Sequence, residues 1–121
     1  MSRFRLKSRR GFTLIEIMIV VLIIAVLLAI AIPNFMKARD TSRAKACVAN
    51  LRQIDTAKVQ WAMDNKKVGG DVPVATDLFP TYVKSEPTCP SGVGAYTLSA
   101  VDTDPVCPNV GTFPTHALIA L

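Results

Sequence analysis

The stretch from Phe12 to Val68 contains no glycine and a single proline, Pro33. Glycine and proline are the residues that most often interrupt a helix, so their near absence over this length favours one long helix. At about 1.5 Å per residue, a helix over residues 12–68 would be about 85 Å long, far longer than an average globular helix. A chain of 121 residues is too short to cover such a helix with its remaining residues. Part of the helix must therefore be covered by lipid or by other copies of the chain.

The first part of this stretch, residues 12–33, is apolar and is long enough to span a bilayer. Glu16 is its only charged residue, and no charged or strongly polar side chain lies between Ile17 and Ile32. We therefore expect residues 12–33 to form a transmembrane helix in contact with membrane lipid.

The residues before this segment form a basic leader over residues 1–11. Five of the first ten residues are Lys or Arg, and none is Asp or Glu. From Gly11 on, nine basic residues balance nine acidic ones, so the net charge of +5 belongs to the leader. Cationic flanks stay in the cytoplasm, which predicts a single-pass inner-membrane protein with its leader inside and its globular domain outside. A nucleic-acid-binding domain would need a clustered basic face, so no nucleic-acid partner is expected.

Residues 34–68 continue the helix with a different, amphipathic pattern. Apolar residues recur mostly at three-to-four spacing, with polar residues on the other side and Lys58 as a break in the stripe. Lys66 and Lys67 complement the helix dipole in the last turn, and Gly69 and Gly70 end the helix. The apolar stripe consists of Ala44, Cys47, Val48, Leu51, Ile54, Trp61 and Ala62.

Residues 69–121 are expected to be a small, loop-rich β domain. Residues 76–79 favour a short helical turn, the alternation over residues 95–101 predicts a strand, and residues 116–121 suggest a last strand. The predicted fold class is therefore α+β, with a long N-terminal α-helix packed on a small C-terminal antiparallel β-sheet. A globular domain of roughly 50 residues would be marginal without a covalent staple or a partner.

The motif Arg-Arg-Gly-Phe-Thr-Leu-Ile-Glu over residues 9–16 carries the functional prediction. Gly11 lets a peptidase approach the backbone closely, and Phe12 would be an apolar new N-terminus. The carboxylate of Glu16 in an apolar helix costs about 2.5–3.5 kcal/mol at the bilayer centre and less near the helix end. The α-amino group freed at Phe12 of a neighbouring subunit would be its partner. The alternative is that Glu16 is only an acid favoured by the helix dipole.

These residues resemble the N-terminal signature of type IV prepilins and type II secretion pseudopilins, and the resemblance covers residues 1 to about 67. It implies cleavage after Gly11 by a prepilin peptidase and N-methylation of Phe12. It also implies docking guided by Glu16, an inner-membrane assembly platform, and a homo-oligomeric helical filament with residues 12–33 in its core. In pilin-like proteins the position of Pro33 is where the membrane segment meets the exposed helix. More loosely, the tail, with Cys-Pro and a second Cys before a His, resembles short bacterial pilin-like proteins.

The predicted function is structural, with no enzyme activity, because no nucleophile–base pair, phosphate loop or metal-ligand cluster is recognisable. A subunit of a type IV pilus-like filament, extending from the cell surface, is favoured over a type II secretion pseudopilin in a periplasmic filament. A single-pass anchored binding protein that never assembles is a third possibility. The sequence Ala-Ile-Ala at residues 29–31 also resembles the A-x-A cleavage site of an ordinary secretory signal, but the Glu within the apolar segment argues against it.

The three cysteines lie on the exported side of the predicted topology, where disulfides form. Cys89 and Cys107 enclose 17 residues, and a disulfide between them would contribute roughly 3 kcal/mol in the chain-entropy model. Cys47 lies on the apolar stripe and is expected to be a buried small side chain, with pairing to a loop cysteine as the alternative. No metal and no cofactor are predicted, because His116 is alone and no short ligand spacing is present. Asp102 and Asp104 are read as turn residues, with calcium binding as the alternative.

Overall fold

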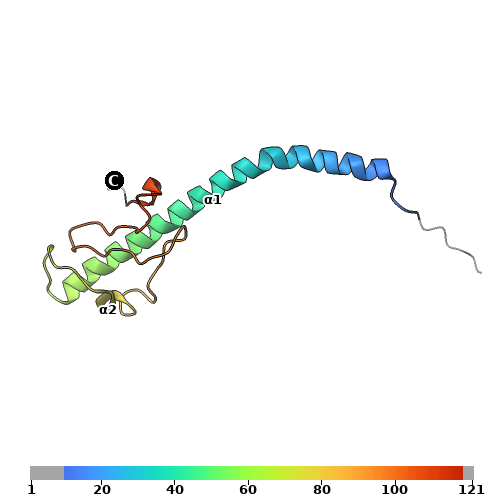
Figure 1. The fold of residues 1–121 in the computed structure, drawn as a ribbon. Coiled ribbons are helices and arrows are strands. Elements are labelled where there is room, and N and C mark those ends of the chain that lie inside the picture. Colours follow the sequence, from blue (N-terminus) through green and yellow to red (C-terminus); the bar gives the residue numbers. More distant parts are fainter. Residues whose placement is uncertain (1–9, 119–121) are drawn as a thin grey trace, which may run out of the picture. The chain divides into compact units, whose positions relative to one another are not determined.

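The computed structural model describes residues 10–118. Along these residues the elements are the helix α1 (Leu14–Asp64), the short helix α2 (Ala75–Leu78) and the 3-10 helix η1 (Pro114–His116) (Figure 1). The chain divides into two compact units, one extending to Lys37 and the other beginning at Ala38. Residues 1–9, which carry most of the predicted leader, and residues 119–121 lie outside the described part.

The long helix predicted from the glycine-free stretch is present as α1, which is 51 residues long and contains Pro33. It ends at Asp64. The predictions that Lys66 and Lys67 lie in its last turn and that Gly69 and Gly70 end it are therefore wrong, since all four residues lie beyond the helix. The backbone of Lys66 has a φ of 53°, and the N–H of Lys67 donates a hydrogen bond of 2.9 Å to the carbonyl of Ala62. This left-handed turn satisfies a carbonyl of the last helical turn and redirects the chain before Gly69.

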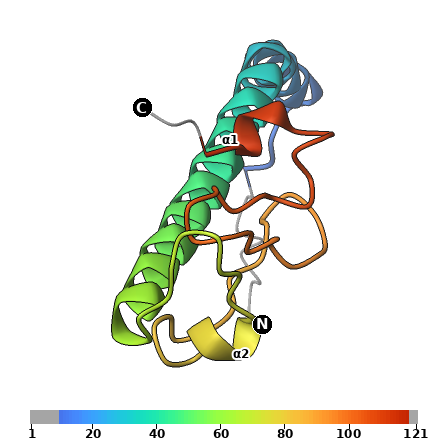
Figure 2. The same ribbon diagram turned by 90° about the vertical axis from the view of Figure 1, so that its left-hand side faces the viewer.

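The second half of α1 provides one side of the hydrophobic core. Residues 69–118 run along it in extended loops, and α2 lies near its C-terminal end (Figure 1 and Figure 2). The predicted stripe is buried, except that Val48 is only partly so. Lys58, which interrupted the stripe in the sequence, is also fully buried on this face. The core formed with the loops comprises Cys47, Leu51, Ile54, Ala57, Trp61, Ala62, Leu78, Val83, Cys89, Tyr96 and Cys107.

The predicted antiparallel sheet is wrong. Among residues 10–118 the structure contains no β-strand, and the only pairings are two isolated bridges, Thr88 with Ala95 and Thr97 with Val106. Residues 116–118 do not begin the predicted last strand, because His116 lies in η1. The rest of that predicted strand, residues 119–121, lies outside the described part. The fold is a long helix covered along its second half by loops.

The short extended segments do not join into strands because their neighbours cannot continue the pairing. Thr97 and Val106 exchange two backbone hydrogen bonds of 2.9 Å each. Pro105 and Pro108 lie close on either side of Val106, and a proline has no N–H to donate to a ladder. On the partner segment Ser99 has a φ of 57°, which interrupts the extended backbone.

Side-chain contacts attach these loops to α1 in place of a sheet. The ammonium group of Lys58 donates hydrogen bonds to the carbonyls of Ala100, at 2.9 Å, and Thr103. Near the end of α1, the hydroxyl of Tyr82 donates a hydrogen bond of 2.9 Å to a carboxylate oxygen of Asp64. Loop position is therefore fixed by individual polar contacts along the helix as well as by apolar packing.

Candidate functional site

The first candidate site is the start of α1, where the predicted processing and assembly residues lie. Gly11 and Phe12 precede the helix and are exposed, and no other part of the described chain comes within 4 Å of a Cβ built on Gly11. The backbone on both sides of the predicted cleavage point is thus open to another protein.

Glu16 lies in the first turn of α1 and forms a reciprocal cap with Thr13. The backbone N–H and the hydroxyl of Thr13 each donate a hydrogen bond of 3.3 Å to the Glu16 carboxylate. The backbone N–H of Glu16 donates in return to the Thr13 hydroxyl, also at 3.3 Å. This is a capping box, which satisfies donors that a helix start leaves without partners. Glu16 thus has a local role in starting the helix, which the sequence argument had considered only as a dipole effect.

The apolar segment that follows is exposed on every side within the isolated chain. All large apolar side chains from Phe12 to Met36 are at least 48% exposed. By length and composition, α1 is the one helix in the described chain able to cross a membrane. A helix that is apolar all round is stable only when lipid or other helices surround it. Pro33 lies within α1 where this segment gives way to polar residues, and it removes one backbone hydrogen bond there.

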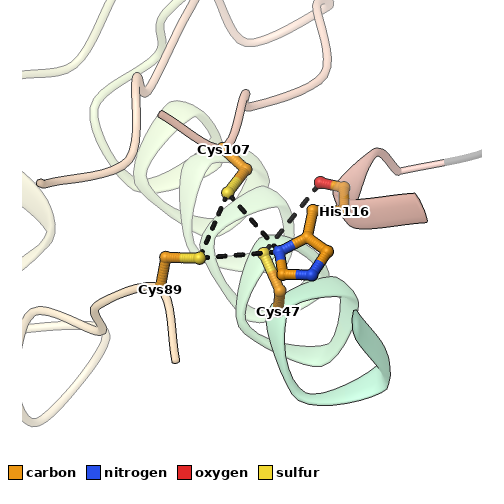
Figure 3. A group of neighbouring side chains, drawn as sticks. All are labelled: Cys47, Cys89, Cys107 and His116. Carbon is orange, nitrogen blue, oxygen red and sulfur yellow. Dashed lines mark hydrogen bonds between the residues drawn. The ribbon is translucent and has the colours of Figure 1, made fainter. Parts of the chain in front are cut away.

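The second candidate site is a cluster of three cysteines and one histidine within the unit that begins at Ala38. Cys47 lies on α1, Cys89 and Cys107 on loops, and His116 in η1, and all four side chains point toward one another (Figure 3). The three sulfur atoms and one ring nitrogen of His116 all lie within 4.8 Å of one another. None of the four residues is more than 3% exposed.

The closest approaches within the cluster lie between 3.4 and 4.0 Å. The sulfur atoms of Cys89 and Cys107 are 3.4 Å apart. The Nδ1 atom of His116 lies 3.5 Å from the sulfur of Cys89 and 4.0 Å from that of Cys107. The Cys47 thiol is 4.0 Å from the backbone carbonyl of His116. The four side chains thus converge on a common centre.

The two loop cysteines are held by turns of the same kind. Each is followed by a proline, and the backbone N–H three residues after the cysteine donates to the cysteine carbonyl, from Gly92 at 3.4 Å and from Val110 at 3.2 Å. Proline favours the second position of such turns. In each turn the backbone N–H two residues after the cysteine hydrogen-bonds to its sulfur. The bridge residues Thr88 and Val106 immediately precede the cysteines.

Burial and these donors shift the thiol pKa values in opposite directions. Burial raises the pKa of Cys47, and it raises that of Cys107 to about 12. Burial also disfavours the charged form of Cys89, but hydrogen bonds from the Ser91 N–H, the Cys107 thiol and His116 outweigh it and lower its pKa to about 6. These donors therefore favour the charged form of Cys89 more than that of the other two thiols.

Two further side chains orient Cys47. The hydroxyl of Tyr96 donates to the Cys47 sulfur at 3.4 Å. The side-chain amide of Asn50 donates to the same hydroxyl at 3.2 Å and to the carbonyl of Thr88 at 3.3 Å. A chain of hydrogen bonds thus joins α1 to the segment that carries Cys89.

The predicted disulfide between Cys89 and Cys107 is absent from the structure. All three cysteines are free thiols, and a separation of 3.4 Å exceeds the disulfide bond length of about 2.05 Å. Cys47 is buried as expected, but next to the other two thiols and not among apolar side chains alone.

The sequence argument expected no metal site because it looked for ligands close together in the sequence. Here the fold brings the four together from separate segments, and the repeated Cys-Pro turns were the local signal.

The turn that contains Asp102 and Asp104 is in contact with the buried side chain of Lys58. The two carboxylates favour the charged form of Lys58, although desolvation by burial has the larger effect and lowers the Lys58 pKa. The Lys58 ammonium contacts the carbonyls of Ala100 and Thr103 in the same turn. The two aspartates therefore lie in a turn that is in contact with the buried side chain of Lys58.

Comparison with known proteins finds a family model that matches the N-terminal segment and relatives whose similarity covers more of the chain. Residues 6–32 match the family model described as the prokaryotic N-terminal methylation motif. The chain is 35% identical over 86 residues to the competence protein ComGC of Bacillus subtilis, a match that covers 70% of this chain and 85% of that protein. Because 86 residues exceed the 51 residues of α1, this similarity extends beyond the helix.

Two other relatives are similar over a smaller share of their own length. The type IV major pilin PilA of Myxococcus xanthus is 53% identical over 57 residues, which are 47% of this chain and 26% of that pilin. The type II secretion system core protein G of Klebsiella michiganensis is 33% identical over 63 residues, 52% of this chain and 44% of that protein. No solved structure matches the chain.

Proposed function

Because the chain belongs to the family of type IV pilins and pseudopilins, we propose that it is a structural subunit of a pilus-like filament and polymerises through its N-terminal helix. The relatives are pilin, competence and secretion proteins, so the proposed role includes no catalysis. The observation that carries the proposal is the apolar segment of α1, whose large side chains are all exposed within the isolated chain.

The apolar segment of α1 can be covered in two ways, by lipid in a membrane-bound subunit and by other copies in an assembled filament. Before assembly, residues 12–33 would be covered by lipid, with the basic leader on the cytoplasmic side and the unit that begins at Ala38 outside. In the filament, copies of the same segment would cover one another, since its large apolar side chains are exposed among the described residues. The proposed partners are therefore further copies of the chain, lipid, a prepilin peptidase and an inner-membrane assembly platform.

The exposed residues before α1 support processing at Gly11. Their accessible backbone fits cleavage after Gly11 by a prepilin peptidase and methylation of the new N-terminus at Phe12. Cleavage would leave the chain beginning one residue before Thr13, so the capping box of α1 is retained in the mature subunit.

Glu16 is the proposed docking residue. Its carboxylate caps its own helix through Thr13 and is exposed, so it can also receive the Phe12 ammonium group of an adjacent subunit. Burying that ammonium without a carboxylate would cost about 3–5 kcal/mol, the typical effect of breaking a buried ion pair.

The variant Glu16→Gln tests this docking. Glutamine can replace glutamate in a capping box, so α1 should still begin at the same place while the charge is lost. Membrane insertion and cleavage should survive, and the amount of subunit in sheared filaments should fall at least tenfold. Thr13→Ala is the matched control, because it breaks the cap and keeps the carboxylate, and it should assemble. Normal filament yield from cleaved Glu16→Gln subunits would contradict the docking role.

The similarity to a type II secretion core protein supports a second candidate, a pseudopilin in a short filament that promotes protein export. Electron microscopy of cells that express the chain separates the two. Surface fibres that label with an antibody to the chain support the pilus. Loss of protein secretion upon deletion, without surface fibres, supports the pseudopilin.

A further inference from the structure

We propose that Cys47, Cys89, Cys107 and His116 bind one zinc ion in a tetrahedral site that fastens the loops to α1. The four potential ligand atoms lie within 4.8 Å of one another, and all four residues are buried. Neither the family model, which ends at residue 32, nor the names of the relatives refer to such a site. The proposal does not depend on filament assembly.

The distances in the cluster fit a metal better than direct bonding. With Zn–S near 2.3 Å and Zn–N near 2.0–2.1 Å, a tetrahedral site separates its sulfur atoms by about 3.8 Å and sulfur from nitrogen by about 3.6 Å. The observed separations are 3.4 Å between the sulfur atoms of Cys89 and Cys107, and 3.5 and 4.0 Å from these sulfurs to Nδ1 of His116. An ion therefore fits among these atoms with small side-chain adjustments.

A disulfide would explain only part of the arrangement. A Cys89–Cys107 bond would use two of the thiols. The buried thiol of Cys47 and the imidazole of His116 also point toward these sulfur atoms, and the disulfide would give them no role. A zinc ion uses all four groups, and a site with four protein ligands is the usual form of a structural zinc centre.

The surroundings supply the donors that metal-bound thiolates need. The backbone N–H groups of Ser91 and Asn109 hydrogen-bond to the sulfurs of Cys89 and Cys107, and the Tyr96 hydroxyl donates to Cys47. Hydrogen bonds of this kind orient ligands and offset the negative charge of three thiolates around a divalent ion. The side-chain nitrogen of Asn109, two residues after Cys107, is a further buried donor and has no hydrogen-bond partner among the described residues.

The ligand types select the metal. Three thiolates and an imidazole are soft and borderline ligands, which exclude calcium and magnesium, both of which require oxygen ligands. All four residues are at most 3% exposed, so no position is open to a substrate or to exchangeable water. A closed tetrahedral site of this composition suits zinc in a structural role.

The position of the site explains why this chain would need it. The ligands come from α1, from the two Cys-Pro turns and from η1, so one ion would join four segments. The described loops have no sheet to hold them, and a small domain with little regular structure usually depends on disulfides or metal. Zinc would thus have the stapling role that the sequence analysis assigned to a disulfide.

The test begins with the processed full-length chain, purified from membranes in detergent without chelators or reducing agents. Elemental analysis should find one zinc per chain. Under denaturing conditions with a chelator, all three cysteines should react with a thiol reagent. Replacement of zinc by cobalt should give the absorption bands of tetrahedral, thiolate-bound cobalt.

Variants separate a ligand role from a merely structural one. Cys47→Ser and His116→Ala should lose the bound zinc, whereas His116→Cys should retain one zinc per chain and change the cobalt spectrum. Ile54→Val, which alters the fully buried core next to the same face of α1, is the matched control and should keep one zinc. Fluorescence of Trp61, the single tryptophan, reports whether each variant is folded.

Several results would overturn the proposal. One is a chain isolated without zinc, whether its thiols are free or Cys89 and Cys107 form a disulfide. Another is a different metal in the site. A third is unchanged zinc content in folded Cys47→Ser and His116→Ala chains.

Discussion

Lys58 lies on the buried face of α1, where its ammonium group is shielded from water. Its side chain is 0% exposed and contacts the carbonyls of Ala100 and Thr103, with Asp55 at 3.7 Å. Burial lowers the Lys58 pKa below its usual value of 10.5, although Asp55 opposes this effect. In the sequence this residue only interrupted an apolar stripe, because the loop carbonyls that it binds are distant in the chain.

The variant Lys58→Met should lower the free energy of unfolding by about 1–3 kcal/mol near pH 7, because two loop carbonyls lose a charged donor. In the wild-type chain this residue's contribution should increase as pH rises toward 10.5. The reason is that between the lowered folded-state pKa and 10.5 the unfolded chain binds more protons than the folded one. Lys58→Met should lose that part of the pH dependence.

Urea unfolding in detergent, followed by Trp61 fluorescence between pH 7 and 10, measures both effects. Lys45→Met, at an exposed position on the same helix, is the control and should leave stability within about 0.5 kcal/mol of wild type. An equal pH dependence in the wild-type and Lys58→Met chains would contradict this account.

At the scale of elements, α1 could be predicted from the sequence and the loops could not. The glycine-free stretch and the three-to-four spacing predicted both the helix and the burial of residues such as Leu51 and Ile54. The alternation around Tyr96 predicted a strand, and this prediction is wrong, because only isolated bridges form there. Strands also need neighbouring segments with free N–H groups, and the prolines on either side of Val106 have none. Sequence patterns report local preference, whereas sheet formation depends on pairing between distant segments.

Of the two candidate sites, likewise, one could be predicted from the sequence and the other could not. The start of α1 lies within consecutive residues, so its motif was recognisable, although the capping contact between Thr13 and Glu16 was not anticipated. The cysteine–histidine cluster depends on contacts across 69 residues, from Cys47 to His116. No local spacing encodes such contacts, and only the folded chain shows that a third thiol and the imidazole join the two loop cysteines.

The end of α1 gives a prediction at this scale. Lys66 has a φ of 53°, a conformation that glycine adopts without the steric cost of a side chain. Lys66→Gly should therefore raise the free energy of unfolding by up to about 1 kcal/mol, measured by the same urea titration. Lys67→Gly is the matched control. It should be neutral or destabilising, because it removes the Lys67 ammonium group, whose Nζ atom lies 5.8 Å from the centroid of the Trp61 ring. Destabilisation by Lys66→Gly would show that the left-handed turn does not limit the helix end.

At the scale of the whole molecule, the two compact units have different requirements. The unit that ends at Lys37 contains an apolar helix segment that needs lipid or other copies around it. The unit that begins at Ala38 has its own core and, in our proposal, a zinc ion that fastens its loops. Membership of the pilin and pseudopilin family accounts for the first requirement through assembly. The second concerns the stability of each subunit.

The mass of the subunit recovered from sheared fibres tests the central claim most directly. A processed filament subunit should begin at Phe12 and carry one added methyl group, and it should be enriched in the fibre fraction relative to membranes. A subunit that retains its leader, or one that begins at Ile32 after an ordinary signal peptidase cut, would contradict the account. The Ile32 product would lack most of the apolar segment through which we propose that the filament assembles.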